Sequence, residues 1–221
     1  MKGRIVPEVD QAFLHKCQRL AALLRLESSN RKNTYAAYCE LQEWLQLGHG
    51  HFSRVFEHPK WSGLVFKFSG PAHFGYNARL ARRPTVRSDA WPVFARHCWK
   101  FPHPNLPAIL HFEQMSPRYS WAIMPKYSSL VDCWYDMIPR VDNEAPYTWA
   151  DEVEQALVSG GSGLQRRTWL MPIHTMVESL GISVDVHQEN VMLDEVNNCF
   201  ILTDPFSFLP EPGIEVQYES S

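Results

Sequence analysis

The most informative stretch of the chain reads Val184-Asp185-Val186-His187-Gln188-Glu189-Asn190-Val191-Met192-Leu193. Asp185 precedes Asn190 by five residues, and an apolar run begins directly after the asparagine. A second apolar run, 199–203, ends directly before Asp204, which lies fourteen residues after Asn190. The polar residues 195–198 separate the two runs, so the spacing predicts a hairpin that carries a polar residue on either side.

This order and spacing are typical of a phosphotransfer site. In such a site the first aspartate orients and deprotonates the acceptor hydroxyl, while the asparagine and the aspartate after the hairpin bind magnesium. Asp185 and Asn190 can also be explained as loop caps, and Asp204 as a turn aspartate before Pro205. Asp185, Asn190 and Asp204 together favour a phosphotransfer site, because two features earlier in the sequence are also typical of one.

The first upstream feature is the glycine-rich run 47–56, which contains Gly48, Gly50 and Ser53. Glycines in a β-turn let backbone N–H groups approach phosphate oxygens, because no Cβ blocks the way. A glycine-rich hairpin without a ligand explains this run about as well.

The second upstream feature is Lys67, which lies within the apolar strand predicted over 64–68. A lysine that projects into a cleft needs an anion, and nucleotide phosphates would supply one. The alternative is a lysine on an edge strand, where its charge discourages aggregation.

The remaining pattern predicts a mostly β region followed by a mostly helical one, with a boundary near Pro125. A helix is expected over Asp10–Leu26, capped by Asp10 and ended by the break at 27–30. Its apolar face would consist of Phe13, Cys17, Leu20 and Leu24. The other expected helices cover 34–45, part of 72–100, 149–158 and 164–180, and the other expected strands cover 52–56, 109–112 and 119–124.

Composition narrows the class of protein. The chain has 221 residues, 45% of them hydrophobic, which is enough for a packed core. Its 21 basic and 24 acidic side chains argue against direct binding to nucleic acid. Its apolar runs are shorter than the roughly 18 residues that span a bilayer, and its five scattered cysteines form no CxxC pair. His49 and His51 form an HxH pair without a nearby acidic or cysteine partner, so a loop role is expected there. A cytoplasmic protein with reduced thiols is expected.

Three segments together resemble the protein kinase-like superfamily. They are Gly48-His49-Gly50-His51-Phe52-Ser53, Asp185-Val186-His187 with Asn190-Val191-Met192, and Thr203-Asp204-Pro205-Phe206-Ser207-Phe208. The last of these is uncommon among kinases at large. With it, the chain looks most similar to the early serine/threonine protein kinases of lytic tailed bacteriophages, which help to shut off host transcription. The resemblance covers about residues 47–209.

The resemblance implies an α+β, bilobal, protein kinase-like fold. Residues 1–46 would form an N-terminal helical region, 47–125 a β-rich nucleotide-binding lobe, and 126–221 a reduced helical lobe. ATP and Mg²⁺ would be the cofactors. The substrates would be host proteins in the bacterial cytoplasm, with RNA polymerase and RNA-processing enzymes as candidates, and neither direct nucleic-acid binding nor membrane binding is implied.

The resemblance also assigns roles to residues. Asp185 would be the catalytic base, His187 would hydrogen-bond the γ-phosphate, and Lys67 would hold the α- and β-phosphates. The ATP phosphates would be covered by Gly48, Gly50 and Ser53, the adenine would lie beside a hinge from Met124 through Lys126 to Tyr127, and magnesium would be held by Asn190 and Asp204.

Several departures from the kinase pattern leave alternatives open. Pro205 and Phe206 follow Asp204 where a DFG glycine is usual, and Ser183-Val184 replaces the usual His-Arg pair. The chain has no glutamate between Glu57 and Glu113, so Asp89 is the nearest acidic substitute for the partner of Lys67.

Only 17 residues follow Asp204, so a cut-down C-terminal lobe is expected. The alternatives are a small-molecule phosphotransferase of the aminoglycoside or choline kinase type, which shares the DxHxxN pattern, and a non-catalytic kinase-like inhibitor of a host protein. Such an inhibitor could use tryptophans at its interface, for which the candidates are Trp61, Trp91, Trp99 and Trp134, although most of them are expected in the buried core.

Overall fold

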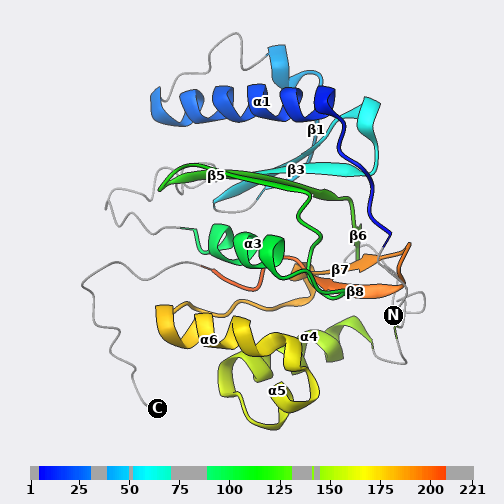
Figure 1. Ribbon diagram of the computed structural model, residues 1–221, viewed down its shortest axis with the longest axis vertical. Helices are drawn as coiled ribbons and strands as arrows, with labels where there is room; N and C mark the ends of the chain where they lie inside the picture. The colour runs from blue at the N-terminus through cyan, green and yellow to red at the C-terminus, as the bar shows by residue number, and fades with distance from the viewer. Residues whose placement is uncertain are drawn as a thin grey trace. The chain divides into compact units, whose positions relative to one another are not determined.

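The computed structural model describes residues 5–30, 39–49, 52–70, 89–130, 141 and 145–207. These residues form helices and two antiparallel sheets (Figure 1). The chain divides into two compact units, of which the first comprises Met1–Pro102 and Pro107–Lys126. The second comprises His103–Leu106 and Tyr127–Ser221. The predicted mixture of helix and antiparallel sheet is confirmed.

A five-stranded antiparallel sheet forms the centre of the first unit, in the order β1-β2-β3-β5-β4. The β2–β3 hairpin predicted from the sequence is confirmed, and the short 3-10 turn Pro59–Trp61 connects its strands. β3 lies between β2 and β5, so hydrogen-bonded neighbours flank it on both sides. The strands are β1 (Leu45–His49), β2 (Ser53–Glu57), β3 (Leu64–Ser69), β4 (His111–Ser116) and β5 (Tyr119–Pro125).

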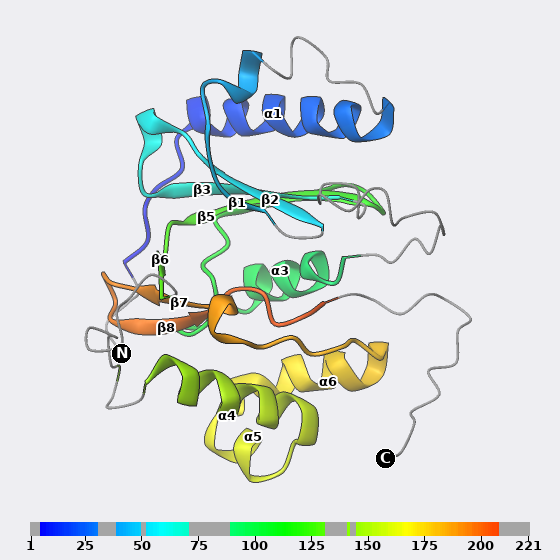
Figure 2. The ribbon, with the colours of Figure 1, turned by 180° about the vertical axis from the view of Figure 1, so that it is seen from behind.

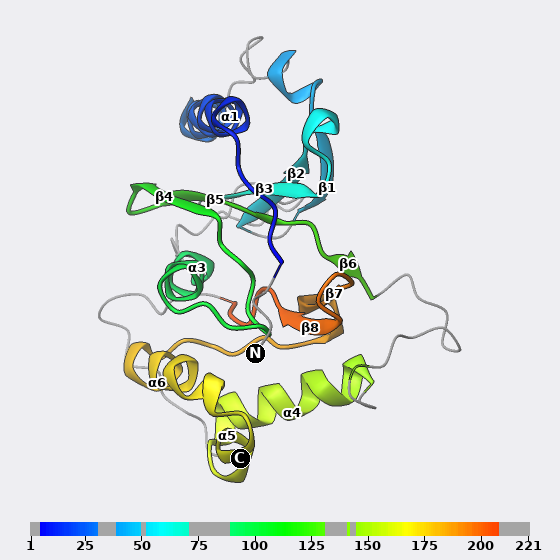
Figure 3. The same ribbon diagram turned by 45° about the vertical axis from the view of Figure 1, so that its right-hand side comes forward.

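Helices α1 (Gln11–Asn30) and α3 (Trp91–Lys100) cover opposite faces of this sheet (Figures 1 and 3). The Asp10 carboxylate caps α1 by accepting a hydrogen bond from Phe13 N at 2.6 Å, as predicted. The predicted apolar face of α1 is fully buried. It packs in one cluster with the strand residues Phe56, Phe66, Phe68, Trp121 and Ile123.

The second unit contains a three-stranded sheet in the order β6-β7-β8 (Figure 2). Its core brings the Trp149 ring to 5.8 Å from the ring centroid of Phe200 in an edge-on contact, and to 6.2 Å from Trp169. The elements are β6 (Ser128–Ser129), β7 (Val191–Asp194), β8 (Cys199–Leu202), α4 (Pro146–Ser159), α5 (Ser162–Arg166) and α6 (Met171–Leu180).

Four of the predicted helices have wrong bounds. The helix predicted over 149–158 covers Pro146–Ser159. α1 continues past Leu26 to Asn30. The helix predicted over 34–45 falls partly outside the described residues, but Leu45 begins strand β1 rather than ending a helix. The helix predicted over 164–180 is interrupted after Arg166, because Arg167 leaves the helical region of φ and ψ. A new helix begins at Met171, and Pro172 in its first turn needs no hydrogen-bond partner because it has no N–H.

The described residues include the α-helices named above. Within them, every helix is too short or too polar to cross a bilayer.

Candidate functional site

The loop that carries Asp185 lies beside the segment that carries Asp204, and both belong to the second unit. Asp185 N donates a hydrogen bond to Pro205 O at 2.8 Å, and Ser207 N donates to Ser183 O at 3.1 Å. These backbone bonds fix the position of Asp185 relative to the residues that follow Asp204. The two segments are therefore adjacent although about twenty residues separate them in the chain.

The other end of the loop is fastened at Asn190. Thr203 donates two hydrogen bonds to Asn190 O, one from its backbone N at 2.9 Å and one from its Oγ1 at 3.0 Å. Just beyond this contact, Val191 of β7 pairs with Leu202 of β8. The β7–β8 hairpin therefore holds Asn190 on one side and Thr203 and Asp204 on the other, which explains the spacing in the sequence.

Asp185, His187 and Asn190 lie together, with the Asn190 amide between the backbone carbonyl of Asp185 and the His187 ring. Asn190 Nδ2 donates to Asp185 O at 2.6 Å and lies 3.0 Å from His187 Nε2. His187 Nε2 lies 3.8 Å from Asp185 Oδ1. The side chains of Asp185 and His187 are 49% and 46% exposed, so both can reach a substrate from solvent. When Asn190 donates to Nε2, the neutral imidazole carries its proton on Nδ1.

Asn190 and Asp204 carry side-chain oxygen atoms of the kind that bind magnesium. The amide nitrogen of Asn190 is turned toward Asp185 O and His187, and its Oδ1 accepts no hydrogen bond within the portion of the chain that the structure describes. Asp204 is half-buried and supplies a carboxylate. Magnesium prefers such oxygen ligands, and it usually takes only one or two from the protein because phosphates and water supply the rest. The same portion of the chain holds no group of three His, Cys, Asp or Glu side chains suited to a metal.

The predicted phosphate-covering loop lies in the β1–β2 hairpin. Gly48 pairs with Val55, and a Cβ added at Gly48 would meet no atom within 4 Å, so packing does not require glycine there. Ser53 begins β2 and is buried. Gly50 and His51 lie outside the described residues.

Lys67 lies in β3 with its side chain buried. Its ammonium is 4.3 Å from the ring centroid of Trp91, the first residue of α3. The alternative that Lys67 is an edge lysine is wrong, because β3 is an interior strand. The suggested pairing of Lys67 with Asp89 stays a prediction. The Asp89 carboxylate accepts hydrogen bonds from Ser69 Oγ and from Trp91 N.

Met124 and Lys126, both predicted beside the adenine, lie at the end of β5. Met124 is buried and pairs with Val65 of β3. Lys126 Nζ forms an ion pair with Glu57 Oε2 at 2.8 Å. Burial raises the pKa of Glu57, but the hydrogen bonds from Lys126 and from Gly63 N outweigh burial, so the pKa lies below its ordinary value.

The sequence did not predict the contact between Lys67 and Trp91. Trp91 was a candidate for an interface, with burial in the core expected for most of the four tryptophans, and at 1% exposure it lies in the core. Trp99 of the same helix is 49% exposed. The available signal was the run Asp89-Ala90-Trp91-Pro92, in which an acidic residue and a proline mark a helix start beside an aromatic ring.

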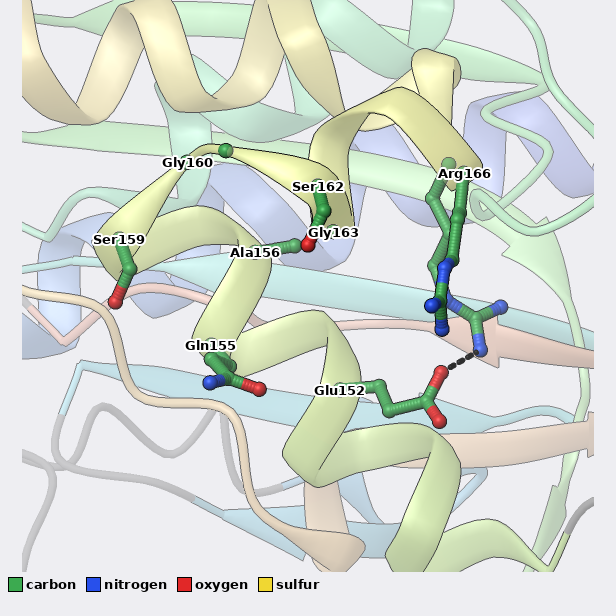
Figure 4. Close-up of a pocket in the computed structure, with 10 residues that line it drawn as sticks. Glu152, Gln155, Ala156, Ser159, Gly160, Ser162, Gly163 and Arg166 are labelled. Atoms are coloured by element: carbon green, nitrogen blue, oxygen red, sulfur yellow. Dashed lines mark hydrogen bonds and ion pairs between the residues drawn. The ribbon is translucent and has the colours of Figure 1, made fainter.

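A cavity of about 360 Å³ lies where α4 turns into α5 (Figure 4). Arg167 Nη2 forms an ion pair with Glu152 Oε2 at 2.7 Å at its edge. The turn between the helices uses Gly160 and Gly161, which both have positive φ. None of the predicted site residues lines this cavity.

Neither the protein-family models nor the curated proteins contain a match to this chain. Among solved structures, the chain is similar to the MAP kinase LmaMPK10 from Leishmania major, with 12% sequence identity and a TM-score of 0.35. That match covers 84% of this chain and 49% of the other. A structure of Rad53 residues 1–466 in complex with AMP-PNP matches with 16% identity and a TM-score of 0.34, covering 76% of this chain and 42% of the other. The chain thus spans about half the length, or less, of these two structures.

Proposed function

We propose that this chain is an ATP- and magnesium-dependent phosphotransferase that acts on serine or threonine hydroxyls of proteins. The observation that carries the proposal is the group formed by Asp185, His187 and Asn190, which backbone hydrogen bonds fasten to the segment containing Asp204. A base and two oxygen ligands for magnesium are residue types that recur in phosphotransfer sites, and the imidazole adds a hydrogen-bond donor for a phosphate.

In this proposal Asp185 is the base. Its half-exposed carboxylate orients the acceptor hydroxyl and takes up its proton as the phosphoryl group is transferred. The imidazole of His187, held by Asn190, donates a hydrogen bond to the γ-phosphate from its Nδ1. Asn190 Oδ1 and the Asp204 carboxylate hold magnesium, which supplies positive charge to the phosphates.

In the same proposal, residues of the five-stranded sheet bind the nucleotide phosphates. The ammonium of Lys67 provides a fixed positive charge in a buried strand. A buried cation is costly unless it has an anionic or aromatic partner, and a polyphosphate is a favourable one. The open space around Gly48 lets a ligand approach the backbone of β1 closely.

The molecule that accepts the phosphoryl group is proposed to be a protein. The motifs that resemble early bacteriophage kinases support host proteins in the bacterial cytoplasm as substrates, with RNA polymerase and RNA-processing enzymes as the first to test. His187 also suits the DxHxxN pattern of small-molecule phosphotransferases, so the test must separate the two acceptor classes.

The test is to incubate the purified protein with γ-labelled ATP, Mg²⁺ and a bacterial lysate. Asp185→Asn should lower protein labelling by at least about 100-fold, because it removes the base without changing the shape of the side chain. Asp151→Asn is the matched control, since Asp151 is an exposed aspartate on α4 in the same unit. EDTA should abolish labelling in every sample.

Three results decide between the possible functions. Labelled proteins that disappear with Asp185→Asn support the proposal. A labelled small molecule in place of proteins would identify a small-molecule phosphotransferase instead. Labelling that is absent, or equal in the wild type and Asp185→Asn, would contradict catalysis and leave a non-catalytic binding protein.

A further inference from the structure

Lys67 and Trp91 are in contact within the first unit. The ammonium of Lys67 lies 4.3 Å from the centroid of the Trp91 ring, a distance typical of a cation–π interaction. Lys67 is 6% exposed and Trp91 is 1% exposed. Because water screens the interaction little at this depth, the ring face attracts the ammonium more strongly than it would on the surface.

Asp89 connects this ring to the strand that carries Lys67. Its carboxylate accepts one hydrogen bond from Ser69 Oγ and another from Trp91 N, the latter at 2.9 Å. Ser69 follows Lys67 by two residues in β3, so their side chains project from the same face of the sheet. Asp89 thus fastens the first turn of α3 to β3 next to Lys67.

The indole nitrogen of Trp91 does not hold the ring in place. Nε1 is buried, and it has no hydrogen-bond partner among the residues that the structure describes. Trp91 is therefore held by its burial and by the hydrogen bond from its backbone N to Asp89, and it contacts Lys67 through its aromatic face. A phenyl ring at this position would keep the interacting face and remove the unsatisfied donor.

We propose that Trp91 is a positioning residue for Lys67. The ring face fixes the flexible lysine side chain in the free protein, so that the ammonium is already oriented when nucleotide phosphates bind. A lysine side chain has much rotamer freedom to lose, and losing it before binding improves affinity. This inference rests on the proposed function, because it assumes that Lys67 contacts the nucleotide.

The test measures the affinity of the full chain for a non-hydrolysable ATP analogue with Mg²⁺. Trp91→Met keeps an apolar side chain but has no aromatic face, and it should weaken binding by about 3- to 10-fold. Trp91→Phe should stay within about twofold of the wild type. In a Lys67→Met background, Trp91→Met should cause no further loss, because its effect acts through Lys67.

Trp121→Met is the matched control. Trp121 is fully buried in β5 and belongs to the cluster under α1, beside Phe68 and on the face of the sheet opposite Lys67. This change should lower the thermal stability about as much as Trp91→Met, yet leave the affinity of the folded protein unchanged. If Trp91→Met does not fold, Ser69→Ala replaces it, because it removes the hydrogen bond to Asp89 and should weaken binding two- to threefold.

The outcomes separate the two proposals. No binding by the wild type, or equal binding by the wild type and Lys67→Met, would contradict the proposed function. Binding that depends on Lys67, but weakens equally with Trp91→Met in both backgrounds or weakens as much with Trp121→Met, would overturn only the role of Trp91.

Discussion

At the scale of single residues, Lys126 shows how one side chain fits two roles. The sequence predicts it beside the adenine, and the structure pairs its ammonium with Glu57 at 2.8 Å. Its backbone N also donates to Gly63 O, and Gly63 N donates to Glu57. Lys126 therefore ties the end of β5 to the β2–β3 hairpin, whatever else it binds.

This ion pair predicts a pH-dependent effect of Lys126→Met. The pKa of Glu57 in the folded protein lies below the ordinary value of 4.5, so the pair stabilises the protein fully above about pH 4.5. That contribution is lost as the pH falls through the folded-state pKa. At pH 7 we expect Lys126→Met to lower the free energy of unfolding by about 0.5–1 kcal/mol, since the lysine side chain is 44% exposed and water screens the pair.

Urea unfolding at several pH values measures this effect. The difference between the wild type and Lys126→Met should shrink below about pH 4.5. Lys100→Met, at an exposed lysine at the end of α3, should change little at any pH. A difference that stays constant between pH 7 and pH 3 would show that the ion pair does not stabilise the fold.

At the scale of elements, helix α1 depends on its packing against the sheet. Leu20 is fully buried in the cluster with the strands, and Leu26 of the same helix is 49% exposed. We expect Leu20→Ala to lower the free energy of unfolding by about 2–5 kcal/mol, because it leaves a cavity. Leu26→Ala should stay within about 0.5 kcal/mol of the wild type. Equal effects of the two changes in urea unfolding would mean that α1 does not pack as described.

The same helix shows what the sequence could predict. A spacing of three and four residues identified its buried face, since that period follows from helix geometry alone. Its end at Asn30 was missed, because the polar residues after Leu26 still allow helical hydrogen bonds. The spacing of Asp185 and Asn190 likewise predicted their loop, within which Asn190 contacts His187. The ring of Trp91 over Lys67 could not be predicted, because it is a tertiary contact between residues 24 positions apart.

At the scale of the whole molecule, the two units are interleaved in the sequence. Residues 103–106 belong to the second unit, although residues of the first unit precede and follow them. Asn105 Nδ2 donates to Phe200 O at 2.9 Å, and Leu202 N donates to Asn105 O at 3.0 Å. The His103 ring also stacks on Trp169 at 5.1 Å. This short segment therefore supports β8, the strand that precedes Asp204.

Because residues 103–106 belong to the second unit, a substitution at Asn105 should destabilise that unit. Asn105→Ala removes the bond from Nδ2 to Phe200 O, and we expect it to destabilise the second unit by about 1 kcal/mol. Hydrogen exchange should become faster at Leu202 and its neighbours in β8, while amides of β2 and β3 keep their protection. Asn198→Ala, in the turn before β8, is unsuitable as a control because Asn198 has positive φ. Gln114→Ala, at an exposed side chain of β4, is the matched change in the first unit. Faster exchange in β2 and β3 with Asn105→Ala would contradict the assignment of residues 103–106 to the second unit.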